Sequence, residues 1–210
     1  MKAARLDLLL RPGATFVGRI FICLDASGNP VDLTGYIPYA EVRLDPLQPV
    51  LIDLHPALVA TGQVTGNASV NVGSDVFTLA NHGLLPGNAV QFVSPGTGGS
   101  LPVPLDPDQT YIVISQNFSG NTFSVCLLSN ALASNFVPVS ITAPGQGSMK
   151  VSVVAGQILM PEITDEDTEQ YSDADAGWDL MLEDPSGRRL AAFVEGKFTI
   201  KRGYTDPALP

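Results

Sequence analysis

Basic residues are scarce in this chain of 210 residues. Eleven lysines and arginines stand against twenty-one aspartates and glutamates, which gives a formal net charge of −10. Proteins that bind nucleic acid or an anionic membrane surface need clustered basic side chains. The largest groupings here are Arg188 with Arg189, and Lys197 with Lys201 and Arg202. We therefore expect neither nucleic acid nor a membrane as a partner.

Cysteine and long apolar runs are also scarce. Cys23 and Cys126 each lie in a short apolar run, and no two cysteines have CxxC spacing. We interpret both as buried free thiols, with a disulfide or a metal site as the alternative. No stretch approaches the 18 or so apolar residues that a membrane span needs. Asp7 interrupts the first apolar run, so we expect no signal peptide and a reducing cytoplasm as the place of synthesis.

Charged residues make up only 15% of the chain, below the roughly 25% of an average domain. Hydrophobic residues make up 45%, and there are 20 glycines and 17 prolines. A chain with little charge and many turn residues is typical of short strands joined by tight turns. The fold class that we predict is therefore all-β.

Composition divides the chain into three zones. Residues 65–149 hold only three acidic residues, whereas the zones on either side are charged. We therefore predict a discontinuous β-sandwich from residues 1–64 and 150–205, an inserted small antiparallel β-barrel or sandwich from 65–149, and a C-terminal tail at 206–210. The strands expected from alternation and apolar runs are 16–24, 39–44, 50–54, 76–79, 89–93, 110–114, 122–126, 139–142, 157–160, 177–183 and 190–200. Residues 164–171 are predicted to form one or two helical turns with Thr164 as the N-cap.

Three stretches of the outer zones carry a family resemblance. Residues 25–36 form a turn-and-strand signature, residues 163–187 a short helix followed by a strand and an Asp-Pro-Ser-Gly turn, and residues 190–200 a closing strand. Together they resemble the small immunoglobulin-like domains of tailed-bacteriophage baseplate and tail-fibre proteins, including the N-terminal domain of the baseplate upper protein. Residues 77–92 and 111–125 are similar, less specifically, to small β modules of phage tail proteins. The resemblance implies an immunoglobulin-like outer sandwich in a virion structural protein that has no catalytic residues and no cofactor. The large insert departs from the family pattern.

Candidate residues for chemistry are few. His55 and His82 lie in turn contexts without a nucleophile and an orienting acid beside them, so we expect no catalytic histidine. The only acidic cluster lacks the spacing of an EF-hand, so we interpret it as a solvated helix start rather than a calcium site. Its members are Asp165, Glu166, Asp167, Glu169, Asp173 and Asp175. No metal site is therefore predicted.

Aromatic residues near the C-terminus are the candidate interface residues. Trp178 is the only tryptophan, and it is interpreted as half-buried in the sandwich or as an interface anchor. Phe193 and Phe198 are five residues apart, so in a regular strand they project to opposite faces, one to the core and one to a partner. Tyr204 lies in the final proline-rich segment, which we interpret either as a frayed tail or as an arm that docks on a neighbouring subunit.

These observations predict a non-enzymatic structural component of a phage tail, at the baseplate periphery or the tail-fibre attachment point. Its partners would be other tail, baseplate or fibre proteins, and closed symmetry would favour a homo-oligomeric ring or trimer. The expected location is the virion, after assembly in the host cytoplasm. One alternative is a carbohydrate-binding module that contacts the host surface through Tyr111, Phe118 and Trp178. A glycosidase with two carboxylates across a cleft is a further alternative.

Overall fold

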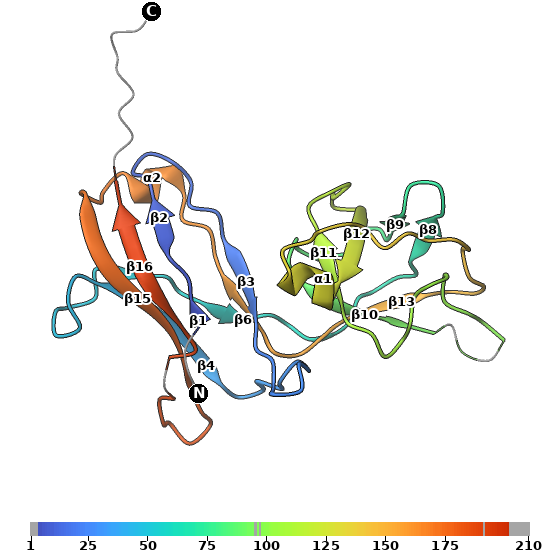
Figure 1. Ribbon diagram of the computed structural model, residues 1–210, viewed down its shortest axis with the longest axis horizontal. Helices are drawn as coiled ribbons and strands as arrows, with labels where there is room; N and C mark the ends of the chain where they lie inside the picture. The colour runs from blue at the N-terminus through green and yellow to red at the C-terminus, as the bar shows by residue number, and fades with distance from the viewer. Residues whose placement is uncertain (1–3, 95, 97, 191, 202–210) are drawn as a thin grey trace, which may run out of the picture. The chain divides into compact units, whose positions relative to one another are not determined.

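The computed structural model describes residues 4–94, 96, 98–190 and 192–201 (Figure 1). Within these residues the chain forms sixteen strands and only two short helices, so the predicted all-β class is confirmed. Neither of the two helices is long and apolar enough to cross a membrane.

The chain divides into two compact units, which are described separately. Unit 1 contains Met1–Phe21, Leu33–Leu58 and Ile158–Pro210, and unit 2 contains Ile22–Asp32 and Val59–Gln157. The units are interleaved in sequence as the composition suggests, but their borders differ from those predicted at 64/65 and 149/150. The borders move because the strands at 62–63 and 150–153 pair within unit 2, and because Ile22 and Leu24 pack on a core cluster of that unit.

Unit 1 contains two sheets. The larger has the order β1-β16-β15-β4-β5, with β2 also paired to β16, and Figure 1 shows β15 and β16 side by side. Its strands are β1 (Ala4–Arg5), β2 (Leu8–Leu10), β4 (Ile37–Arg43), β5 (Ile52–Asp53), β15 (Ala174–Glu183) and β16 (Val194–Ile200). The smaller sheet has the order β3-β14-β6, with β3 (Arg19–Ile22), β6 (Ala57–Leu58) and β14 (Gln157–Met160), of which the end residues Ile22 and Gln157 belong to unit 2.

The core of unit 1 lies between these sheets. Side chains on β15 alternate, so that Ala176, Trp178, Leu180 and Leu182 are buried while the residues between them point outward. Aromatic contacts join the layers, because the ring of Phe21 on β3 lies 6.2 Å from that of Trp178. The arrangement is a β-sandwich.

Local signals in the sequence identify the turns of unit 1 correctly. The short helix α2 (Asp165–Thr168) begins after Thr164, whose hydroxyl accepts a hydrogen bond from the Asp167 amide at 3.3 Å. The Asp184 side chain holds the β15–β16 connection through the amides of Ser186 and Arg188. The predicted N-cap and the predicted hairpin are therefore both confirmed.

Unit 2 is built on one seven-stranded sheet in which every neighbouring pair is antiparallel. The order is β7-β13-β10-β11-β12-β9-β8. The strands are β7 (Gly62–Gln63), β8 (Ser69–Asn71), β9 (Val76–Thr78), β10 (Ala89–Val93), β11 (Tyr111–Ile114), β12 (Thr122–Leu127) and β13 (Lys150–Val153). Strand pairing does not close the sheet into a barrel within the described residues, although an isolated bridge joins Ala68 and Met149.

Two apolar clusters lie in unit 2. The larger contains a stack of rings in which Phe77 lies 4.9 Å from Phe92 and 5.4 Å from Phe123. The smaller consists of Ala89, Ile112, Ile114, Cys126 and Leu128, with Ile22, Leu24, Ala131 and Val154 packed against it. Leu128 and Ala131 belong to the short helix α1 (Leu128–Leu132), which the sequence analysis did not predict.

One predicted strand of unit 2 is wrong. Residues 139–142 form no strand, although Ile141 is buried as an apolar strand residue would be. The Ile141 amide donates to the Asp75 carboxylate at 2.7 Å instead of to a neighbouring strand. A side chain 66 positions away therefore replaces the ladder partner that a strand would need.

Candidate functional site

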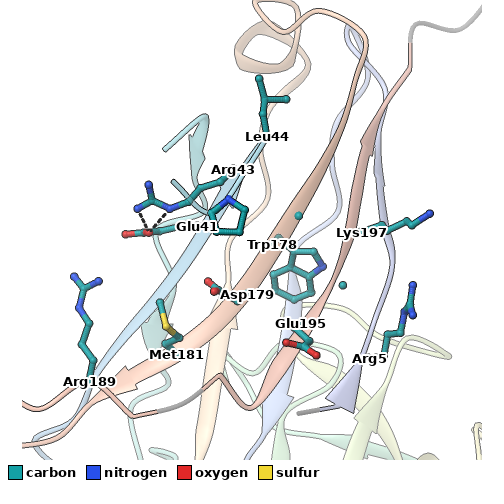
Figure 2. Close-up of a pocket in the computed structure, with 13 residues that line it drawn as sticks. Arg5, Glu41, Arg43, Leu44, Trp178, Asp179, Met181, Arg189, Glu195 and Lys197 are labelled. Carbon is teal, nitrogen blue, oxygen red and sulfur yellow. Dashed lines mark hydrogen bonds and ion pairs between the residues drawn. The ribbon is translucent and has the colours of Figure 1, made fainter. Parts of the chain in front are cut away.

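The outward face of the larger sheet of unit 1 carries a groove of about 640 Å³ (Figure 2). This volume falls in the range of protein sites that bind ligands, roughly 300–1,000 Å³. The lining comes from β1, β4, β15 and β16, together with Leu44 and Pro46 from the connection after β4 and Arg189 from the connection before β16. The groove is therefore built on regular strands, which hold side chains in fixed relative positions.

Strand register arranges the charged side chains of the groove in rows. Asp179 on β15 is the pairing partner of both Glu41 on β4 and Glu195 on β16, so three carboxylates lie side by side across three strands. The adjacent row contains Arg43, Gly177 and Lys197. A row of negative charge therefore lies beside a row of positive charge, and the two rows are two residues apart along each strand.

A third row lies on the other side of the carboxylates. Met181 pairs with Tyr39 there, and the guanidinium carbon of Arg189 lies 4.6 Å from the centre of the Tyr39 ring. Figure 2 shows Arg189 and Met181 on one side of Asp179, with Lys197 and Arg5 on the other. Four of the eleven basic residues of this acidic chain therefore line one groove: Arg5, Arg43, Arg189 and Lys197.

Hydrogen bonds fix one end of the carboxylate row. Arg43 donates to the Glu41 carboxylate at 2.5 Å and to the Gln48 carbonyl at 2.6 Å. The Glu41 side chain is only 16% exposed, so this ion pair is partly shielded from water. The Arg43 guanidinium is therefore already paired within the molecule. It contributes to the shape of the groove but is not an unpaired charge for a ligand.

The Asp179 carboxylate is partly buried and lies between two other carboxylates of the groove. Burial raises the pKa of Asp179, the nearby Glu41 carboxylate raises it further, and Glu195 adds to the same effect, against the opposite influence of Arg43 and Arg189. No hydrogen bond or ion pair holds its side chain among the described residues. A half-buried carboxylate of this kind would be stabilised by a donor or a cation brought by a ligand.

Replacing Asp179 with asparagine should stabilise the free protein at neutral pH. When the pKa of a carboxyl group is higher in the folded than in the unfolded state, its ionisation favours unfolding. The Asp179 carboxylate therefore lowers the free energy of unfolding as the pH rises above the ordinary pKa of 3.8. We expect Asp179→Asn to gain less than about 1 kcal/mol at neutral pH and nothing below that value. Urea denaturation over a pH series measures this. Asp175→Asn removes a charge from the exposed end of β15 and serves as the control, and an equal gain there would contradict the explanation.

The structure changes the interpretation of the predicted interface residues. Trp178 is 3% exposed and Phe198 is fully buried, so neither side chain is available as an exposed anchor. Trp178 Nε1 donates to the Leu6 carbonyl at 2.8 Å, and the Phe198 ring lies 6.0 Å from that of Phe16 in the core. Phe193 is half-buried just before β16. Tyr204 and the predicted tail at 206–210 lie outside the described residues.

The other candidate residues do not gather into one site. His55 is exposed in unit 1, where Nδ1 lies 3.5 Å from Asp53. His82 is buried in unit 2, where Nδ1 accepts a hydrogen bond from the Leu84 amide at 3.0 Å and its ring packs on Phe123. Among the described residues, no group of three or more His, Cys, Asp or Glu side chains has a geometry that could hold a metal ion, and this includes the cluster around α2.

Both cysteines are free thiols. Cys126 is fully buried, whereas Cys23 is half-buried. Burial raises the pKa of Cys23 to about 11 and also raises the pKa of Cys126. A thiol in such surroundings is a poor nucleophile, because the reactive form is the thiolate.

Sequence reasoning missed the groove, although part of its signal was present. Glu41 and Arg43 occupy the polar positions of an alternating strand, and Asp179 does so on β15. Alternation identifies these residues as outward-facing, but it does not reveal that β4, β15 and β16 are neighbours in this register. The β15–β16 pairing is a local hairpin, but the pairing of β4 with β15 joins residues more than 100 positions apart.

Comparison of the chain with models of protein families, with curated proteins and with solved structures found no match. The functional argument therefore depends on the groove, on the surface beside it and on the resemblance carried by the sequence.

Proposed function

We propose that this protein is a structural component of a phage tail, at the baseplate periphery or the tail-fibre attachment point, and that it acts by binding other protein surfaces rather than by catalysis. The order of the signatures at residues 25–36, 163–187 and 190–200 supports the family assignment. In this proposal the partners are tail, baseplate or fibre proteins and further copies of the chain. The location is the virion, reached after assembly in the host cytoplasm.

The observation that carries the proposal is an apolar loop between β4 and β5, residues 44–51. Leu47 is 93% exposed, and three more aliphatic side chains of this loop are exposed with it: Leu44, Val50 and Leu51. Leu44 and Pro46 also line the groove, so the exposed apolar surface and the charged groove are continuous on unit 1. Contiguous apolar surface of this kind is typical of protein–protein contact sites.

Hydrogen bonds hold this loop in one conformation. The Leu47 amide donates to the Asp45 carboxylate at 2.9 Å, and Arg43 donates to the Gln48 carbonyl. The Leu51 amide donates to the Val42 carbonyl at 2.7 Å, which returns the chain to the sheet. Because the loop is already ordered, a partner would spend little free energy on fixing it.

The aromatic residues that a carbohydrate-binding module would need are not exposed. Sugar rings bind to exposed aromatic faces, and the sequence offered Tyr111, Phe118 and Trp178 for that purpose. Tyr111 is 1% exposed and Trp178 is 3% exposed. Phe118 is half-buried and packs against the ring of His82. No arrangement of these three side chains therefore favours a sugar platform.

The test is co-purification with the tail proteins encoded beside this chain, followed by light scattering and negative-stain imaging. We expect a defined ring or trimer, alone or with those proteins, and loss of at least about tenfold in affinity for Leu47→Ser. Val17→Ser removes another exposed aliphatic side chain, 74% exposed and outside the loop, and should assemble normally. A strict monomer that binds none of the tail proteins would contradict the proposed function.

A further inference from the structure

The spacing of the rows in the groove on unit 1 matches the spacing of side chains in an extended peptide. The rows cross β15 at residues 177, 179 and 181, two residues apart along one strand, and the third row is charged only through Arg189, whose guanidinium lies over Tyr39. Consecutive rows are therefore separated by about 7 Å, which is also the spacing of side chains i and i+2 in an extended segment. A peptide laid along β15 would present one side chain to each row.

The charges of the rows alternate in sign, and neighbouring charges act on them: Lys197 acts on Asp7, and Arg43 and Arg189 act on Asp179. Among the described residues, neither the Lys197 ammonium group nor the Glu195 and Asp179 carboxylates form a hydrogen bond or ion pair through their side chains. Arg189 lies over Tyr39 and is 4.0 Å from Glu183. The sequence of charge along β15 is therefore positive at Lys197, negative at Asp179 and positive at Arg189.

The row of Lys197 contains a gap at Gly177. A Cβ atom built there would meet nothing closer than the Arg43 carbonyl at 4.0 Å, and the residue does not need a positive φ. Glycine is therefore not required by the fold at this position. Glycine within a strand often marks a place where another backbone approaches closely.

We infer that this groove binds an extended segment of a partner protein in which a basic residue stands between two acidic ones at alternate positions. The basic side chain would pair with Asp179 and Glu195, the first acidic side chain with Lys197 and the last with Arg189. The main chain of the segment would pass over Gly177. This inference rests on the proposed function only in that the occupant is a protein, and it specifies the chemistry of that partner.

The experiment uses the full chain and two capped peptides of equal length. The matched peptide is Thr-Asp-Thr-Lys-Thr-Asp-Thr. The second peptide, Thr-Lys-Thr-Asp-Thr-Lys-Thr, has the opposite sign at every charged position and is called the reversed peptide for that reason. Isothermal titration calorimetry measures the binding of each peptide, because the Trp178 side chain is buried on the core side of the sheet and is not a direct reporter of the groove. We expect saturable binding of the matched peptide, at least about tenfold weaker binding of the reversed peptide, and weakening by salt.

Variants locate the site. Asp179→Asn should weaken the matched peptide about tenfold, and Gly177→Val should do the same by filling the gap. Asp175→Asn removes a charge from the same strand outside the lining and should bind normally. Thermal unfolding of each variant shows that it is folded.

Three results would overturn the inference. The first is equal binding of the reversed peptide, and the second is unchanged binding by Asp179→Asn. The third is self-association that Asp179→Asn abolishes, because the occupant would then be a second copy of this chain.

Co-purification separates this inference from the proposed function. If tail proteins bind the wild type and Asp179→Asn alike, the groove assignment is wrong and the proposed function stands. If they bind neither protein, the proposed function fails, whereas the peptide titration still tests the groove.

Discussion

Gly196→Ala should destabilise unit 1 by about 3 kcal/mol or more, as an overpacking substitution with a broken hydrogen bond would. A Cβ atom at this position would overlap the carbonyl group of Leu6 and would lie 3.1 Å from Trp178 Nε1. Leu6 is fixed on both sides, because its amide donates to Glu195 and its carbonyl accepts from Trp178. The N-terminal segment could move away only by losing these bonds.

Guanidinium denaturation followed by the fluorescence of Trp178 measures this effect directly. Gly177→Ala is the matched control, because Gly177 lies on the neighbouring strand and its added methyl group would meet open space. We expect the control to change the free energy of unfolding by less than about 1 kcal/mol. Equal stability of the two variants would show that the N-terminal segment is not held where the structure places it.

Gln157→Leu should destabilise unit 2 by about 3–5 kcal/mol, since several buried polar groups would lose their partners together. The Gln157 side chain is 1% exposed and bonds to both polar groups of the Ala89 backbone. It also donates to the Val154 carbonyl at 2.7 Å and accepts from the Asn88 side chain at 3.2 Å. Leucine has a similar size but offers none of these bonds.

Calorimetry of the full chain and hydrogen exchange at the Ala89 amide would measure the loss. Gln63→Leu is the control, because Gln63 is an exposed glutamine on β7, in the sheet that contains Ala89. We expect that variant to unfold within about 0.5 kcal/mol of the wild type. If Gln157→Leu matched it, the four hydrogen bonds would not be contributing to stability.

The sequence was informative wherever a local rule determines the structure. Period-two alternation located β4, the strand expected at 177–183 makes up most of β15, and the Asp-Pro-Ser-Gly sequence at 184–187 identified the hairpin turn. The same alternation also had an unused consequence. Trp178 is in phase with Leu180, and Phe198 is in phase with Ile200, so strand phase alone assigns both aromatic residues to the core side.

Features that depend on distant partners could not be predicted. Gln157 was interpreted only as part of an apolar strand, because its partner Ala89 lies 68 positions earlier in the chain. The assignment of Ile22–Asp32 to unit 2 depends on packing against Ala89, Ile112 and Cys126. The groove likewise requires the register of three strands. Each of these features is a tertiary relation, which the residue types along one segment do not encode.

The N-terminal strands β1 and β2 both run parallel to the C-terminal strand β16, with Ala4 opposite Val194 and Leu10 opposite Ile200. Tension applied at Ala4 and at Ile200 would therefore act along the strands and load their hydrogen bonds in shear, all at once rather than one after another. Unit 2 is inserted between these strands in sequence. The force would therefore not act on unit 2 until the hydrogen bonds between β16 and its parallel neighbours β1 and β2 had broken. A protein with this connectivity can transmit mechanical load through one of its units while the other stays relaxed.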